Sequence, residues 1–184
     1  GIMHRALSTA YPRRWVICDD FTGHHPIEVD DVEDWDFDLK WYGDIKIAPT
    51  GSVNLTCSLQ MPMNSRILVE RDGALVVDGG VVYGDCDFWK GIEVWGNRNE
   101  SQFPVNSHVQ GSAYILNSSE IWDMEDGIYT YKDLGSGAID WDYTGGLVVA
   151  ANSSFYNNKR AIQLMSYTNF VPGFPNKFRF NRSG

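Results

Sequence analysis

Internal repetition is the feature of this sequence that most constrains its fold. Four segments open with glycine and run into a short apolar stretch, with loops of different length between them. Their first residues are Gly51, Gly73, Gly111 and Gly145. A unit of this size cannot bury its own apolar face, so it has to stack on the next unit, as in solenoid proteins.

The last two of these units align without a gap at a spacing of 34 residues. Apolar and polar residues alternate within them, and helical periodicity is nearly absent. We therefore predict an all-β chain that forms a single-stranded right-handed parallel β-helix, with the hand that parallel crossovers prefer. The alignment predicts three pairs of equivalent positions: Ile115 with Val149, Ile121 with Phe155, and Ile128 with Ile162.

The two ends of the repeat pattern lead to a domain prediction. Residues 44–184 are expected to form the rungs, and residues 1–43 an N-terminal segment whose Trp15, Trp35 and Phe37 plug the open end as a cap. A β-sandwich is the alternative fold, because the Asp-Gly pairs in "RDGA" and "EDGI" could be hairpin turns.

The segment "CDFWKGIEVWGN", residues 86–97, adds a third copy of one strand. Aligning Ile92 with Ile128 and Ile162 makes it the same strand in three successive rungs, with Val94, Thr130 and Leu164 also inward. The outward positions then form two rows, one of Glu93, Tyr129 and Gln163 and one of Trp95, Tyr131 and Met165.

Insertions follow this strand in every rung. They occupy residues 97–110, 132–144 and 168–177, and insertions on one edge often mark the binding face of a repeat protein. The alternative is that the loops, or the N-terminal segment, cover the aromatic row and bury it as a second small core. The predicted ligand-binding residues are Glu93, Trp95, Tyr129, Tyr131, Trp141, Tyr143 and Gln163, with Phe174 beside them.

Two stretches carry a family resemblance. "MPMNSRILVERDGALVVDGGVVYGDCDFWKGIEVWGN" and "SSFYNNKRAIQLMSY" resemble the right-handed β-helix modules of large secreted surface proteins from Bacteroidetes, many of which are cargo of the type IX secretion system. The resemblance covers the chain from Trp15 to its end. It implies an exported, cell-surface protein whose signal peptide is not present in this chain, and a fragment of a longer parent protein.

Charge and composition limit the function. With a net charge of −9, the chain lacks the basic surface that nucleic-acid binding requires. No apolar run is long enough for a membrane span. We expect a non-enzymatic module of a bacterial surface protein. Its role would be that of a stalk or adhesin-like unit that binds a glycan or a surface protein on its loop edge.

The alternative function is a polysaccharide lyase or glycoside hydrolase. A lyase needs carboxylates for Ca²⁺ and a base, and a hydrolase needs two opposed carboxyls. Acidic residues are also ordinary in β-turns, because they bond nearby backbone amides. The candidate catalytic residues are Glu93, Asp123, Asp126 and Arg160, with Glu125, Lys132, Asp140 and Asp142 nearby in the sequence.

No metal site is predicted from spacing, and no cofactor is expected apart from Ca²⁺ in the lyase alternative. His24 and His25 are adjacent and lack a third ligand, and "DVEDWDFD", residues 31–38, fits an exposed edge strand better than a Ca²⁺ loop. The cysteines are Cys18, Cys57 and Cys86, an odd number that leaves at least one thiol unpaired in a monomer. They are either small core residues or include one disulfide.

Overall fold

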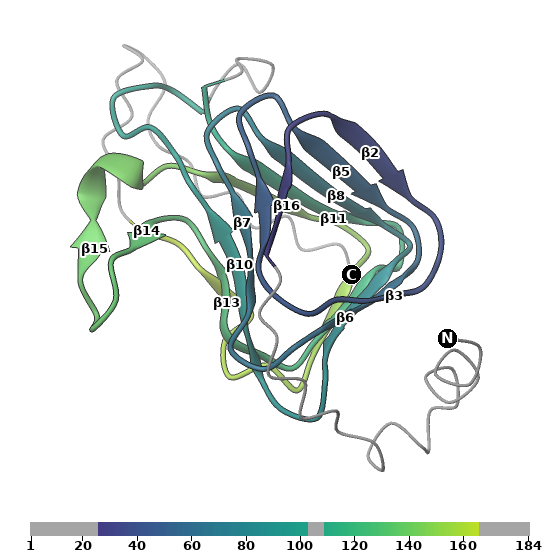
Figure 1. Ribbon diagram of the computed structural model, residues 1–184. Coiled ribbons are helices and arrows are strands. Elements are labelled where there is room, and N and C mark those ends of the chain that lie inside the picture. The colour runs from purple at the N-terminus through teal and green to yellow at the C-terminus, as the bar shows by residue number, and fades with distance from the viewer. Residues whose placement is uncertain (1–25, 103–108, 166–184) are drawn as a thin grey trace.

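The computed structural model describes residues 26–102 and 109–165, which are all-β with parallel sheets. Successive strands visit three sheets in turn, and one circuit of the three is called a rung (Figure 1). Sheet A contains β1 (Ile27–Val29), β4 (Ile45–Ile47), β7 (Arg66–Val69), β10 (Trp89–Val94), β13 (Met124–Tyr129) and β18 (Ile162–Gln163). Sheet B contains β2 (Val32–Trp35), β5 (Ser52–Leu55), β8 (Ala74–Asp78), β11 (Ser112–Leu116) and β16 (Leu147–Ala150). Sheet C contains β3 (Leu39–Lys40), β6 (Ser58–Met61), β9 (Val81–Gly84), β12 (Glu120–Trp122) and β17 (Ser154–Tyr156).

The three sheets face one another around a common axis (Figure 1). Stacked inward side chains form the core between them. Isoleucines occupy one inward position of sheet A in six successive strands, in register throughout. They are Ile27, Ile45, Ile67, Ile92, Ile128 and Ile162. The four central ones are buried, and each burial stabilises the fold by about 1.5–3 kcal/mol, whereas Ile27 is partly buried and Ile162 is 39% exposed. The predicted equivalence of Ile92, Ile128 and Ile162 is therefore confirmed, and so is that of Ile121 with Phe155.

The third predicted pair is wrong by one residue. Ile115 lies opposite Ala150, and Val149 lies opposite the outward Tyr114. The cause is the turn between sheets B and C: four residues separate Ile115 from Glu120, whereas three separate their partners Ala150 and Ser154. Its residues with left-handed backbone are Asn117 and Ser118 after β11, and Asn152 alone after β16.

The prediction of an N-terminal cap over residues 1–43 needs correction. β1, β2 and β3 pair in parallel register with β4, β5 and β6, so the chain from Ile27 onward is already a rung. Trp35 is buried in the core of this rung and stacks on Trp41 at 6.4 Å between ring centroids, whereas Phe37 is exposed. Trp15 lies outside the described residues.

The first rung also bears on two other predictions. β2 is the last strand of sheet B, so the acidic stretch that contains it forms an edge strand as predicted. The Asp-Gly pairs do not form sandwich hairpins: Asp72-Gly73 lies in the turn from sheet A to sheet B, and Gly127 lies within β13. Every strand pair described in sheets A, B and C is parallel.

The insertion after β13 contains the antiparallel pair of β14 (Lys132–Asp133) and β15 (Ile139–Asp140), followed by the 3₁₀ turn η2 (Trp141–Tyr143). It projects from the edge of sheet A (Figure 1). The insertion after β10 leaves from the same edge and contacts it. Gln102 Nε2 donates to the carbonyls of Gly145 and Gly146, and Arg98 pairs with Asp142 at 3.2 Å. The third predicted insertion, residues 168–177, lies outside the described residues.

The described cysteines have different states. Cys86 is in a disulfide, and Cys57 is a free, buried thiol of the core. Burial and the charge of Asp38 raise the pKa of Cys57 above its ordinary value. In the described part of the chain, no helix is long and apolar enough to cross a membrane.

Candidate functional site

Glu93 is the centre of the site, and its position is unusual. The residue lies on the outer face of sheet A, yet its side chain is 0% exposed, because the insertion after β13 covers it. Four donors surround the carboxylate. Oε1 accepts from Trp95 Nε1 at 2.7 Å and from the Asp133 amide at 3.0 Å, and Oε2 accepts from Arg66 Nη1 at 2.5 Å and from the Tyr129 hydroxyl at 3.1 Å. A buried carboxylate is tolerated when it is paired and hydrogen-bonded in this way.

The charges of this cluster reinforce one another. Burial lowers the pKa of Arg66, but the negative charge of Glu93 and the contacts with Tyr129 more than offset this, so the net shift is upward. Burial and the charge of Glu93 raise the pKa of Tyr129 well above its ordinary value. Tyr129 therefore stays protonated and keeps donating to Glu93.

Aromatic rings and cations hold the insertion on the sheet. The Tyr143 ring meets Trp95 edge-on at 4.8 Å between centroids, and Lys132 Nζ lies 4.6 Å from the centre of the Trp95 ring and 4.4 Å from that of Tyr143. Arg71 lies 4.1 Å from the Tyr143 ring centre and also donates to the carbonyls of Gly96 and Asp142. Cation–π contacts of this kind contribute about 0.5–2 kcal/mol each, depending on their exposure.

Gly96 follows the strand that contains Glu93, and its close contact with the returning insertion requires a glycine. A Cβ atom added at Gly96 would collide with the backbone of residues 144–146, where the insertion returns to the body of the protein. The Gly96 amide donates to the Tyr143 carbonyl at 2.8 Å. Only glycine allows the two backbones to approach so closely.

The first predicted outward row is right in register, since Glu93 lies opposite Tyr129 and Tyr129 opposite Gln163. The side chains of these positions are less exposed than a binding platform would require. Glu93, Tyr129 and Tyr131 are buried, and the rings of Tyr129 and Tyr131 lie 5.0 Å apart under the insertion. The structure thus has the second small core that the sequence left as the alternative. Of the predicted ligand-binding residues, it unites Glu93, Trp95, Tyr129, Tyr131 and Tyr143, while Trp141 lies exposed on the insertion and Gln163 lies beside Arg160.

The other catalytic candidates do not converge on Glu93. Arg160 pairs with Asp126 at 3.3 Å at the surface of sheet A. Asp123 is buried in the turn before β13, where it accepts from Asn157 at 2.7 Å. The remaining acidic candidates have surface partners: Glu125 pairs with Lys159 at 2.6 Å, Asp140 accepts from the Asp142 amide at 3.1 Å, and Asp142 pairs with Arg98.

The ionisation of Asp126 is expected to affect the stability of the fold. Burial raises its pKa above the ordinary value, the charge of Glu125 adds to the shift, and Arg160 opposes it. Ionisation therefore costs the folded state: the stabilising contribution is complete at low pH and is lost as pH rises through the folded-state pKa. Asp126→Asn is expected to raise the free energy of unfolding slightly at pH 7 and to change it little near pH 3, as measured by urea denaturation. A variant that is weakened at pH 7 alone would show that the Arg160 pair dominates.

Sequence reasoning missed Arg66 and Arg71, the two residues that complete the site. Arg66 lies opposite Gly91 in the neighbouring strand, two positions before the level of Glu93. An outward arginine one rung below an outward glutamate was the available signal for the ion pair. Nothing in the sequence indicates Arg71, because its partners lie on the insertion, far along the chain.

Metal binding has no support within residues 26–102 and 109–165, where no group of three or more His, Cys, Asp or Glu side chains is placed to hold an ion. His24, His25 and Phe174 lie outside these ranges. In comparisons with known proteins, no family model, no curated protein and no solved structure matches the chain.

Proposed function

We propose that this chain is a right-handed parallel β-helix that serves as a rigid spacer in an exported bacterial surface protein, of the Bacteroidetes kind that its sequence resembles. The observation that carries this proposal is the continuous inward column of sheet A, which runs in register through six strands. A structure of this kind is held by contacts between neighbouring rungs and can be extended by repetition.

The state of Glu93 supports a spacer over the alternative polysaccharide lyase or hydrolase. Four hydrogen bonds from neighbouring residues occupy its carboxylate oxygens, and the insertion shields them from a substrate. A hydrolase needs two carboxyls that face one substrate bond across an open groove. The second carboxyl candidates, Asp123 and Asp126, are engaged elsewhere.

Export is supported by the disulfide at Cys86. Disulfides form and persist in oxidising compartments outside the cytoplasm and are rare within it. The acidic surface fits an exported protein that must stay soluble beside other macromolecules.

Two measurements test the proposal. Antibodies against the chain should label intact cells of the source organism, and the label should be lost after external protease treatment. Label that appears only after lysis would refute export. The purified chain, with and without Ca²⁺, should release no products from a panel of uronate-containing and neutral polysaccharides. Product formation that is abolished in Asp126→Asn or Glu93→Gln would establish the enzyme instead.

A further inference from the structure

The turn that carries Trp141 is held rigidly on the insertion. The Asp142 carbonyl accepts from Arg71 Nη2 at 2.7 Å, the Tyr143 carbonyl accepts from the Gly96 amide at 2.8 Å, and the Thr144 hydroxyl donates to the Trp141 carbonyl at 2.9 Å. Thr144 itself is buried. The backbone around Trp141 is thus fixed before any ligand arrives.

The indole of Trp141 contrasts with its neighbour. The ring of Tyr143 packs between Trp95, Lys132 and Arg71, whereas Trp141 is 50% exposed. Within the described ranges, neither a ring contact nor a hydrogen bond engages the Trp141 indole. An aromatic side chain that is exposed on a rigid backbone loses little conformational entropy when it binds, so it is suited to be a contact residue.

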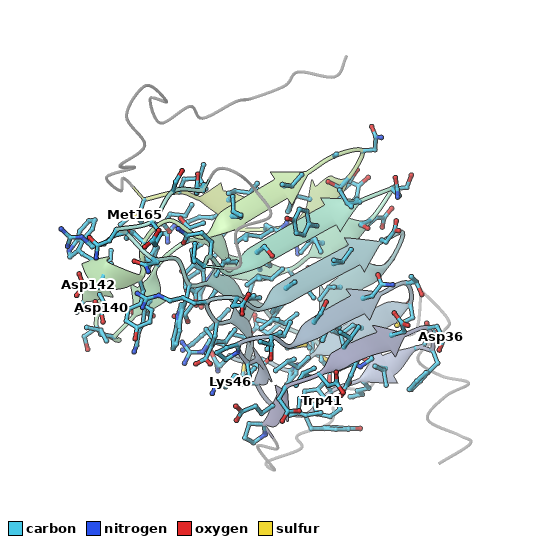
Figure 2. All side chains as sticks on the ribbon, turned by 90° about the horizontal axis from the view of Figure 1, so that it is seen from above. Asp36, Trp41, Lys46, Asp140, Asp142 and Met165 are labelled. Atoms are coloured by element: carbon cyan, nitrogen blue, oxygen red, sulfur yellow. The ribbon has the colours of Figure 1, made fainter. Side chains whose placement is uncertain are left out.

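Polar residues lie next to Trp141 along the chain. Asp140 and Asp142 flank it in the sequence, and Arg98 from the other insertion joins them through its 3.2 Å pair with Asp142. Figure 2 places Asp140 and Asp142 on the part of the insertion that projects from the sheets. Carboxylate and guanidinium groups beside an aromatic face can bond the hydroxyls of a ligand whose apolar side lies on the ring.

We propose that the outer face of the 140–144 turn binds a neutral glycan, with one sugar ring stacked on Trp141 and its hydroxyls held by Asp140, Asp142 and Arg98. Asp140 and Asp142 are balanced by Arg98 and Arg71 around the turn, and the net charge of −9 on the chain disfavours anionic glycans and anionic surfaces. A protein partner would need a larger apolar area than one indole rimmed by charges. The inference does not depend on the spacer function, since it concerns the insertion alone.

Calorimetric titration of the full chain with neutral hexasaccharides tests the site. The ligands are cellohexaose, laminarihexaose, mannohexaose and xylohexaose, with oligogalacturonate as the charged comparison. Trp141→Ala should weaken binding about tenfold or more, and Trp141→Phe, which keeps an aromatic face, should weaken it much less. Phe37→Ala is the matched control, because Phe37 is equally exposed (52%) but lies in the first rung.

Binding of at least one neutral hexasaccharide that falls in Trp141→Ala and persists in Phe37→Ala supports the site. The proposal is overturned if no neutral ligand binds at millimolar concentration, if Trp141→Ala binds as well as the parent chain, or if oligogalacturonate binds as tightly as the best neutral ligand. None of these results alters the surface-labelling and depolymerisation tests of the spacer function.

Discussion

Replacing Glu93 with alanine is expected to lower the free energy of unfolding by about 3–5 kcal/mol, the cost of breaking a buried ion pair from one side. The substitution leaves Arg66 without its buried partner. It also removes the acceptor of the Trp95 indole, the Tyr129 hydroxyl and the Asp133 amide. Urea denaturation at neutral pH, followed by tryptophan fluorescence, measures the loss.

The control for Glu93 is a glutamate whose ion pair is exposed. Glu28 pairs with Lys46 at 3.1 Å on the same sheet, but its side chain lies mostly in solvent. Glu28→Ala should cost no more than about 1 kcal/mol. Replacing both Glu93 and Arg66 by leucine should cost less than Glu93→Ala, because no buried charge is left unpaired: Asp44, which loses its 3.7 Å pair with Arg66, is partly exposed. Equal losses for Glu93→Ala and Glu28→Ala would show that Glu93 does not fasten the insertion.

Register could be predicted from sequence because the side-chain period of a strand is two. A shift of one residue would turn a whole set of apolar side chains outward, so the pattern around Ile92, Ile128 and Ile162 permits one alignment. The Ile115 pair was misaligned because a gapless alignment cannot see a turn that is one residue shorter. The first rung was missed because β3 is only two residues long and no glycine opens its strands.

Exposure of the outward rows could not be predicted in the same way. The alternation of side chains along a strand predicts that Glu93 and Tyr129 point away from the core. What covers them depends on where a distant loop folds back. The covering insertion is fixed by Gly96, Arg71 and Tyr143. Trp141 is the predicted ligand-binding aromatic that remains half-exposed, and only the structure separates it from Tyr143.

Trp89→Ala is the second substitution expected to have a large effect, with a loss of about 3–5 kcal/mol in the free energy of unfolding. Trp89 is a large, fully buried side chain, and its Nε1 donates at 2.8 Å to the Trp122 carbonyl at the end of β12. Alanine would leave a cavity where β10 begins and would remove the indole donor of that hydrogen bond. Trp89→Phe fills most of the space but cannot donate, so it should lose less than Trp89→Ala.

Trp141→Ala is the matched control for Trp89, since it removes the same side chain from the surface. Its cost should stay within about 0.5 kcal/mol, because Trp141 is half-exposed and its backbone contacts do not involve the indole. Thermal and urea unfolding of the three variants give the comparison. A large loss in Trp141→Ala would mean that the indole supports the fold. A small loss in Trp89→Ala would contradict the enclosed core on which the predicted stability of the stacked rungs depends.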